Sequence, residues 1–213
     1  QFSMSPFLID THCHLNFGAF KNDADSIARE CLDQNIWMIN VGSQASTSER
    51  AVRFAEQFSE GVYAAVGLHP SHLVDMEVAE EEAKFATHAE DFDHDFYKNL
   101  AQSPKVVAIG EAGLDYHYVP EHEELNGIKN KQADIFRKHL DLADEMNLPI
   151  IIHARETYGE IGDIVGQYID QGKLKKRGVL HCFLGDWEEA ERFLKFGFLI
   201  SFTGIITFAP KKS

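Results

Sequence analysis

The segment LIDTHCH (residues 8–14) is an apolar run that ends in two histidines one residue apart. Four later segments share this design, in which an apolar run leads to a residue able to bind a metal: VGLHP (66–70), VVAIGEAGLD (106–115), IIIHARE (150–156) and VLHCF (179–183). Near-continuous runs of Val, Ile and Leu are typical of parallel strands that are covered on both faces. The pattern therefore predicts a parallel sheet that carries metal-binding side chains at the carboxyl ends of its strands.

Strand and helix patterns alternate along the chain, with 28 to 57 positions between successive motif residues. This spacing leaves room for a helix between neighbouring parallel strands. We predict one α/β domain over residues 1–213, folded as a TIM (β/α) barrel rather than an open sheet, because all strand ends of a barrel meet at one face. The predicted strands are 7–12, 36–41, 62–68, 105–110, 149–153, 178–182 and 197–203, and residues 128–147 form a predicted amphipathic helix.

Only seven strands are predicted, so the eighth strand and final helix of a barrel are missing. After Phe208 the sequence ends in Ala-Pro-Lys-Lys-Ser. Three explanations stay open: the polypeptide is truncated at its C-terminus, the strand count is wrong by one, or a partner chain closes the barrel. An open barrel exposes two sheet edges, which proteins usually protect.

The composition is that of a globular protein, with 213 residues of which 44% are hydrophobic. No apolar stretch approaches the roughly 20 residues that span a bilayer, and Gln1–Pro6 lacks the basic and apolar regions of a signal peptide. The three cysteines, Cys13, Cys31 and Cys182, are odd in number and irregularly spaced, which favours reduced thiols. We therefore predict a cytoplasmic protein without a membrane partner.

The net charge of −14 argues against non-specific binding of nucleic acid through the bulk field. The argument is weak, because bound divalent cations reverse the sign of charge at a site. Much of the acid lies between Asp75 and Asp95, which we predict to be a solvated helical insertion.

The candidate metal ligands come from four of these strand ends. His12 and His14 are two residues apart, so both project to one face of a strand and could bind one metal. Glu111 ends a buried strand, where a carboxylate is costly unless it is paired or metal-bound, and it could bridge two cations. His153 and His181 occupy equivalent positions on successive strands and, with Glu111, predict a second metal site.

Three further residues have two interpretations each. His69 could bind a substrate phosphate or stabilise the turn at Pro70. Arg155 could clamp a phosphate or form a salt bridge, and Asp115 could orient a ligand histidine or cap the following segment. The remaining histidines lie in polar or helical stretches and are predicted at the surface: His72, His88, His94, His117, His122 and His139.

Taken together, the motifs in residues 7–208 resemble the TatD-like deoxyribonucleases of the metal-dependent hydrolase superfamily. The resemblance rests on Asp10-Thr-His-Cys-His-Leu15, Gly67-Leu-His-Pro70, Gly110-Glu-Ala-Gly-Leu-Asp115, Ile152-His-Ala-Arg155, His181-Cys-Phe183 and Ser201-Phe-Thr-Gly-Ile-Ile-Thr-Phe208. It implies a TIM barrel that hydrolyses DNA, often from single-stranded ends in the 3′ to 5′ direction, with two divalent ions (Zn, Mn or Mg).

By this resemblance His12 and His14 hold the first metal, Glu111 bridges, and His153 and His181 hold the second. The family also supplies an Asp from its eighth strand, in a Glu-Thr-Asp motif, that completes the first site and helps to activate the water. No such motif follows Phe208.

Two other functions remain in view at this point. One is a metal-dependent hydrolase of a small ester, lactone or amide, which the acidic net charge favours. The other is a metal-binding but catalytically inactive interaction protein, which the absence of the eighth-strand Asp favours. The sequence leaves the oligomeric state open.

Overall fold

The computed structural model describes residues 5–73, 76–79, 84–87, 89–117 and 125–208. The predictions made for His88 and His122 lie outside the described residues, and that for Gln1–Pro6 lies mostly outside them. Among the described residues, no helix is both long enough and apolar enough to cross a membrane.

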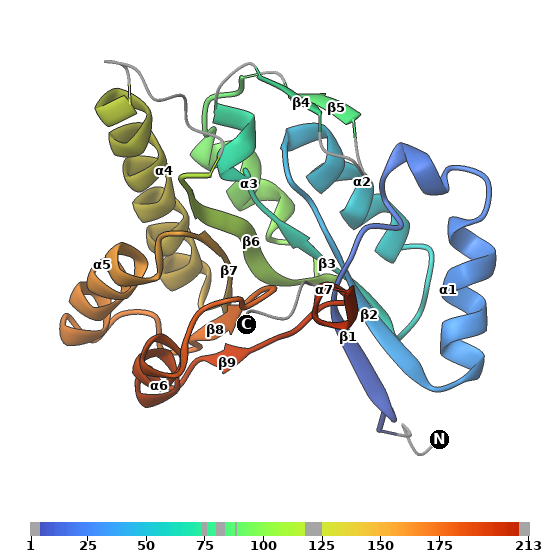
Figure 1. Ribbon diagram of the computed structural model, residues 1–213. Coiled ribbons are helices and arrows are strands. Elements are labelled where there is room, and N and C mark those ends of the chain that lie inside the picture. Colours follow the sequence, from blue (N-terminus) through green and yellow to red (C-terminus); the bar gives the residue numbers. More distant parts are fainter. Residues whose placement is uncertain (1–4, 74–75, 80–83, 88, 118–124, 209–213) are drawn as a thin grey trace.

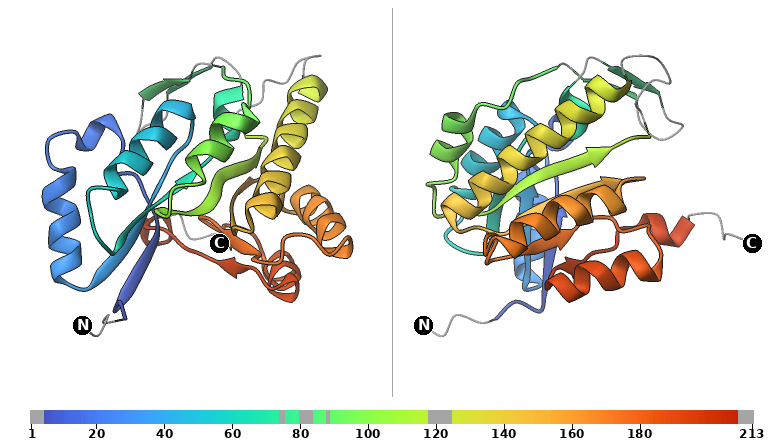
Figure 2. Two further views of the ribbon diagram at one scale, coloured as in Figure 1. Left: turned by 180° about the vertical axis from the view of Figure 1, so that it is seen from behind. Right: turned by 90° about the vertical axis from the view of Figure 1, so that its left-hand side faces the viewer.

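A curved parallel sheet of seven strands forms the centre of the molecule, with its helices on the convex side (Figures 1 and 2). Each of these strands pairs in parallel with the one before it in the sheet. The α/β class and the incomplete TIM barrel are confirmed. In sheet order the strands are β1 (Leu8–Cys13), β2 (Ile36–Val41), β3 (Val62–Val66), β6 (Val106–Asp115), β7 (Ile150–Arg155), β8 (Gly178–Leu180) and β9 (Leu199–Ile200).

The elements of the outer layer follow the strands in chain order. The helices are α1 (Ala24–Asp33), α2 (Ala45–Ala55), α3 (His94–Leu100), α4 (Leu125–Met146), α5 (Tyr158–Asp170), α6 (Trp187–Phe196) and α7 (Ile205–Phe208), with short 3-10 turns η1 (Gly18–Phe20) and η2 (Pro70–Leu73). The main core lies between sheet and helices, and a smaller apolar cluster including Val41, Ala108 and Ile151 lines the concave face.

The prediction of a helical insertion between Asp75 and Asp95 is wrong for most of the residues that the structure describes there. Strands β4 (Met76–Ala79) and β5 (Lys84–Thr87) pair in an antiparallel hairpin, and helix α3 begins only at His94. The prediction rested on the acidic composition of this stretch. Strand pairing depends instead on contacts with a partner strand, which local composition does not reveal.

His139 was predicted at the surface and is instead fully buried. It lies four residues after Ile135 and three after Phe136, so the helical period places it on the core face of α4. The charged residues next to His139 in the sequence led to the prediction of a surface position, although the helical period indicates a buried one. His117 is exposed as predicted, whereas His72 and His94 are half-buried.

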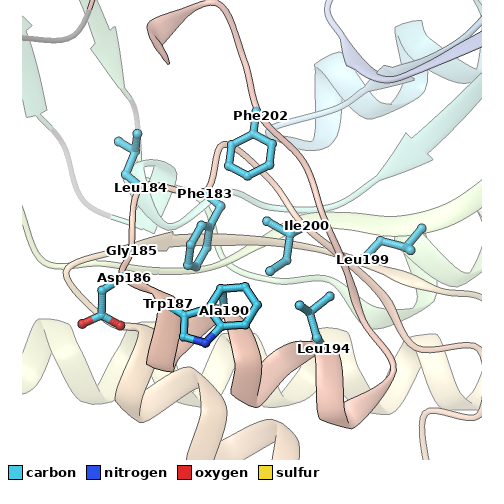
Figure 3. A pocket seen from close by; sticks show the side chains of 10 residues that line it. All are labelled: Phe183, Leu184, Gly185, Asp186, Trp187, Ala190, Leu194, Leu199, Ile200 and Phe202. Atoms are coloured by element: carbon cyan, nitrogen blue, oxygen red, sulfur yellow. The ribbon is translucent and has the colours of Figure 1, made fainter. Parts of the chain in front are cut away.

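The sheet remains open between β9 and β1, which do not pair with each other in the described residues. Large apolar side chains are exposed beside this gap, among them Phe7 (85%), Trp187 (70%) and Leu199 (68%). Helix α6 and β9 also line a groove of about 630 Å³, with Trp187 and Leu194 on one side and Phe183, Ile200 and Phe202 on the other (Figure 3). Contiguous exposed apolar surface of this kind is typical of interaction sites.

This groove leads to a first prediction. A polarity-sensitive dye such as anilinonaphthalene sulfonate should bind the protein, because the groove offers apolar surface to small aromatic anions. A double variant, Trp187→Gln with Leu199→Lys, removes the two most exposed apolar side chains of the groove. It should lower the dye fluorescence by about half or more. The matched control is Glu188→Lys, an exposed substitution on the same helix. Equal fluorescence in all three proteins would contradict the prediction.

A second prediction concerns His139. Burial lowers the pKa of its imidazole from 6.5 to about 4. The unfolded chain therefore binds the extra proton first, so this contribution to stability is complete above pH 6.5 and is lost as the pH falls to about 4. The loss is on the order of 3 kcal/mol. Urea unfolding of the wild type and His139→Gln across this range should show the stability difference shrink towards acid pH, and a constant difference would contradict it.

Candidate metal centre

The end of β1 supplies two imidazoles, His12 within the strand and His14 just after it. The Nδ1 atom of His14 lies 3.0 Å from the carbonyl oxygen of Val41. Because a carbonyl only accepts, Nδ1 must carry the proton, which leaves the lone pair of Nε2 free for a metal. Burial, followed by the neighbouring His12, lowers the pKa of His14 and keeps the ring neutral.

Glu111 lies on β6 and is 5% exposed. Its Oε2 atom is 3.3 Å from Nε2 of His12, and its Oε1 atom is 3.1 Å from Nδ1 of His153 and 3.9 Å from Nε2 of His69. Burial alone raises the pKa of this carboxyl. The neighbouring imidazoles of His12 and His153 outweigh burial, so the pKa of Glu111 lies well below its usual range and Glu111 is an anion.

His153 is held between two carboxylates. Its Nδ1 faces Glu111 and its Nε2 is 3.0 Å from Oδ2 of Asp115. Burial lowers the pKa of the imidazole, but the hydrogen bonds to Asp115 and Glu111 prevail and raise it to about 9. Asp115 also accepts a hydrogen bond at Oδ1 from the backbone N–H of His117, at 3.0 Å. Asp115 thus contacts both groups that its two predicted roles involve, the ring of His153 and the backbone of the following segment.

His69 follows β3, with its ring fixed by the turn that comes after it. The backbone N–H of Ser71 donates to Nδ1 at 3.1 Å. Burial, followed by the charge of His153, lowers the pKa of His69 to about 3, so the ring is neutral. A neutral ring that accepts at Nδ1 carries its proton at Nε2. His69 therefore presents an N–H donor to the centre, while also serving the turn at Pro70.

His181, just beyond β8, lies flat against His12, with ring centroids 3.4 Å apart and an interplanar angle of 16°. Burial lowers the pKa of His181 to about 4, so this ring too is neutral. Both rings line a cavity of about 310 Å³ whose wall is completed by Asp10, Thr11, Ser201, Phe202, Thr203 and Gly204. The cavity leaves room for a small polar group beside the two imidazoles.

The donor set fits divalent cations. Two groups of potential ligand atoms, each within 4.8 Å of one another, share Glu111: one with His12 and His14, the other with His69 and His153. Both ring nitrogens of His12 and Nδ1 of His181 are buried without a hydrogen-bond partner. Unpaired buried polar atoms are costly, and mixed imidazole and carboxylate ligands suit zinc or manganese.

The structure brings together all five predicted ligands, but in a different grouping. His69, rather than His181, lies within reach of Glu111 and His153, and His181 sits beside His12. Arg155 ends β7, half-buried and level with Asp115 in the ladder between β6 and β7. Its binding of a phosphate stays a prediction.

Two buried asparagines that the sequence analysis passed over hold the His14 loop. Asn40 accepts a hydrogen bond at Oδ1 from the backbone N–H of Leu15, and Asn16 donates to the carbonyls of Val41 and Thr47. Asn40 is fully buried inside the apolar run of β2. A lone amide inside such a run was the available signal, because it must find backbone partners.

Comparison with known proteins gives the family. A sequence model described as TatD related DNase matches residues 9–213. The chain belongs to this family. Its relatives include YabD of Bacillus subtilis, an uncharacterized metal-dependent hydrolase that is 34% identical over 96% of this chain and 72% of its own length. YcfH of Escherichia coli K12, which carries the same description, is 30% identical over 95% of this chain and 68% of its own length.

Solved structures agree. YjjV of Escherichia coli K12, a TatD homologue, superposes with a TM-score of 0.74 at 28% identity, over 92% of this chain and 68% of that one. A TatD family hydrolase of Entamoeba histolytica shares the fold, with a TM-score of 0.72 at 22% identity over 95% and 66% of the two chains. The protein is thus a metal-dependent hydrolase of the TatD family.

A third prediction follows from the sharing of Glu111 by both groups. Glu111→Ala should lower manganese affinity at both sites by about 100-fold or more, a larger loss than the 10- to 100-fold typical of residues that only support the ligands. Equilibrium dialysis with Mn²⁺ measures this. Glu145→Ala, which removes a surface carboxylate that pairs with Lys98, is the matched control. Wild-type stoichiometry and affinity in Glu111→Ala would refute the bridging position.

Proposed function

We propose that this protein is a metal-dependent deoxyribonuclease that removes nucleotides from single-stranded DNA ends in the 3′ to 5′ direction, in the cytoplasm. The observation that supports this most is a single buried carboxylate, Glu111, shared by two groups of potential ligand atoms. Paired metal sites about 3.5–4 Å apart are common in enzymes that displace groups at phosphorus. The family description as a DNase agrees with this reading.

The proposed metal ligands are His12 and His14 for one cation and His153 and His181 for the other, with Glu111 between them, and His181 would have to turn from its place beside His12 to take this part. When bound, two cations polarise a phosphoryl oxygen and lower the pKa of a water molecule. His14 is ready for this role, because its Nδ1–H is engaged by Val41 and its Nε2 is free. His153 must release one proton to become a ligand, and Asp115 then keeps its ring in place.

The substrate contacts proposed are His69 and Arg155. The Nε2–H of His69 points to the side of Glu111, where it can donate to a phosphate oxygen. Arg155, two residues after His153 on β7, can hold a phosphate through its planar guanidinium. Neither contact involves a nucleobase. The proposed activity therefore depends on the ends and the phosphate backbone of the DNA and is independent of its sequence.

A small ester, lactone or amide substrate is the second candidate, and the net charge of −14 favours it. A strongly negative protein repels a polyanion at long range, an effect that salt screens within about 10 Å at 0.1 M. If DNA is the substrate, cleavage should therefore tolerate or gain from moderate salt. A small neutral ester would show no such dependence.

The fourth prediction is tested with single-stranded DNA labelled at the 3′ or the 5′ end. With Mn²⁺, Mg²⁺ or Zn²⁺ present we expect stepwise loss from the 3′ end, abolished by chelator and lowered about 100-fold or more in Glu111→Ala. Glu145→Ala serves again as the control, and the full product of the reading frame is tested in parallel. Absence of DNA cleavage with turnover of aryl esters would replace the proposal with the second candidate. Metal binding without any turnover would favour a non-catalytic protein.

A further inference from the structure

Helix α4 carries two buried polar side chains that the proposed chemistry does not use. Gln132 is 3% exposed and His139 is fully buried. They are seven residues apart, which is close to two helical turns, so both project from the same face of α4. Helix α4 packs against β6, which carries Asp115, and against the η2 turn, which directly follows His69. Buried polar groups need a partner, and the partner of Gln132 lies in β6, whereas that of His139 lies two residues before η2.

Gln132 grips the backbone of Asp115 with both ends of its amide. Its Oε1 atom accepts from the Asp115 N–H at 2.9 Å, and its Nε2 atom donates to the Asp115 carbonyl at 3.0 Å. The last pairing between β3 and β6 joins Val66 to Ile109, six residues before Asp115. Within the part of the chain that the structure describes, the end of β6 thus has no strand neighbour on the β3 side. The Gln132 amide supplies the donor and acceptor that such a strand would have provided.

His139 grips the backbone just before His69. Its Nε2 atom accepts from the N–H of Leu68 at 2.9 Å, and its Nδ1 atom lies 2.8 Å from the carbonyl oxygen of Ile135. A donor on one side and an acceptor on the other fix a single neutral tautomer, with the proton on Nδ1. The ring is further confined by Phe92, at 4.3 Å between centroids.

We infer that Gln132 and His139 are positioning residues, through which α4 fixes the strand ends that present Asp115 and His69 to the metal centre. The inference rests on the proposed function of that centre. Asp115 must reach His153, with 3.0 Å between Oδ2 and Nε2, and its backbone is what Gln132 holds. His69 must aim Nε2–H at the centre, and the peptide that precedes it is what His139 holds. Displacement of such groups by about 1 Å can lower a rate by 100-fold.

Three variants at these positions and one control on the same helix form the fifth prediction. Gln132→Leu and His139→Leu remove the grip, whereas His139→Gln retains an oxygen that can accept from Leu68. Leu142→Ala is the control, because it opens the core under a fully buried residue of α4 that makes no polar contact with either strand end. All are studied at a temperature where circular dichroism shows each protein folded.

Gln132→Leu should weaken Mn²⁺ binding about 10-fold or more, measured by equilibrium dialysis, because the ring of His153 loses its fixed support. His139→Leu should leave Mn²⁺ binding within about 3-fold of wild type and instead shift the imidazole ¹⁵N resonances of His69. His139→Gln should restore the His69 resonances, and Leu142→Ala should change neither quantity. On DNA, His139→Leu should mainly lower kcat.

Two results would overturn the inference. In the first, Gln132→Leu binds Mn²⁺ as tightly as the wild type does but loses as much stability as Leu142→Ala. Gln132 would then have only a structural role. The other is a His69 spectrum unchanged in His139→Leu, or equally disturbed in His139→Leu and His139→Gln. If the wild type cleaves no DNA, the proposed function fails, but the Mn²⁺ and ¹⁵N measurements still decide the role of α4.

Discussion

The architecture depends on neutralising one buried anion, Glu111. A carboxylate at 5% exposure is stable only with compensating partners, and those partners come from β1 and β7. Strands β1 and β6 are separated by β2 and β3 in the sheet, yet His12 and Glu111 approach to 3.3 Å. Only a strongly curved sheet allows this contact. The curvature of the sheet, the burial of Glu111 and the charge balance of the centre therefore depend on one another. The helices that pack on the outside of the sheet hold it in this curved form.

Much of this arrangement was accessible from the sequence because its signals are local. A continuous apolar run such as Ile150–Ile152 predicts a covered parallel strand, and the polar residue that ends it must then lie at the common rim. The candidate ligands Glu111 and His153 were predicted in this way. The grouping of ligands was not, because it depends on how far the sheet curls. The choice between His69 and His181 as a neighbour of Glu111 is a property of three-dimensional curvature rather than of spacing.

Polar side chains inside the structure were harder to predict than apolar ones. Gln132 and His139 lie in a helix rich in charge, and this composition led to the prediction of a surface position for His139. The helical phase set by Ile135 and Phe136 places them in the core, where each satisfies a backbone group beyond the end of a strand ladder. Their partners, Asp115 and Leu68, are 17 and 71 residues away in sequence. Long-range satisfaction of this kind leaves no mark in a local window.

The centre is not equally well supported on all sides. Glu111 lies in a ten-residue strand and His153 in one of six, whereas His181 follows β8 of three residues, next to β9 of two. Short ladders at a sheet edge open most readily. Phe202 lines both the cavity of His181 and the apolar groove beside Trp187. A contact that orders the groove therefore also orders the wall of the cavity. The groove and the surroundings of His181 are consequently coupled through Phe202, whereas His153 is supported from the other side by α4 through Gln132 and Asp115.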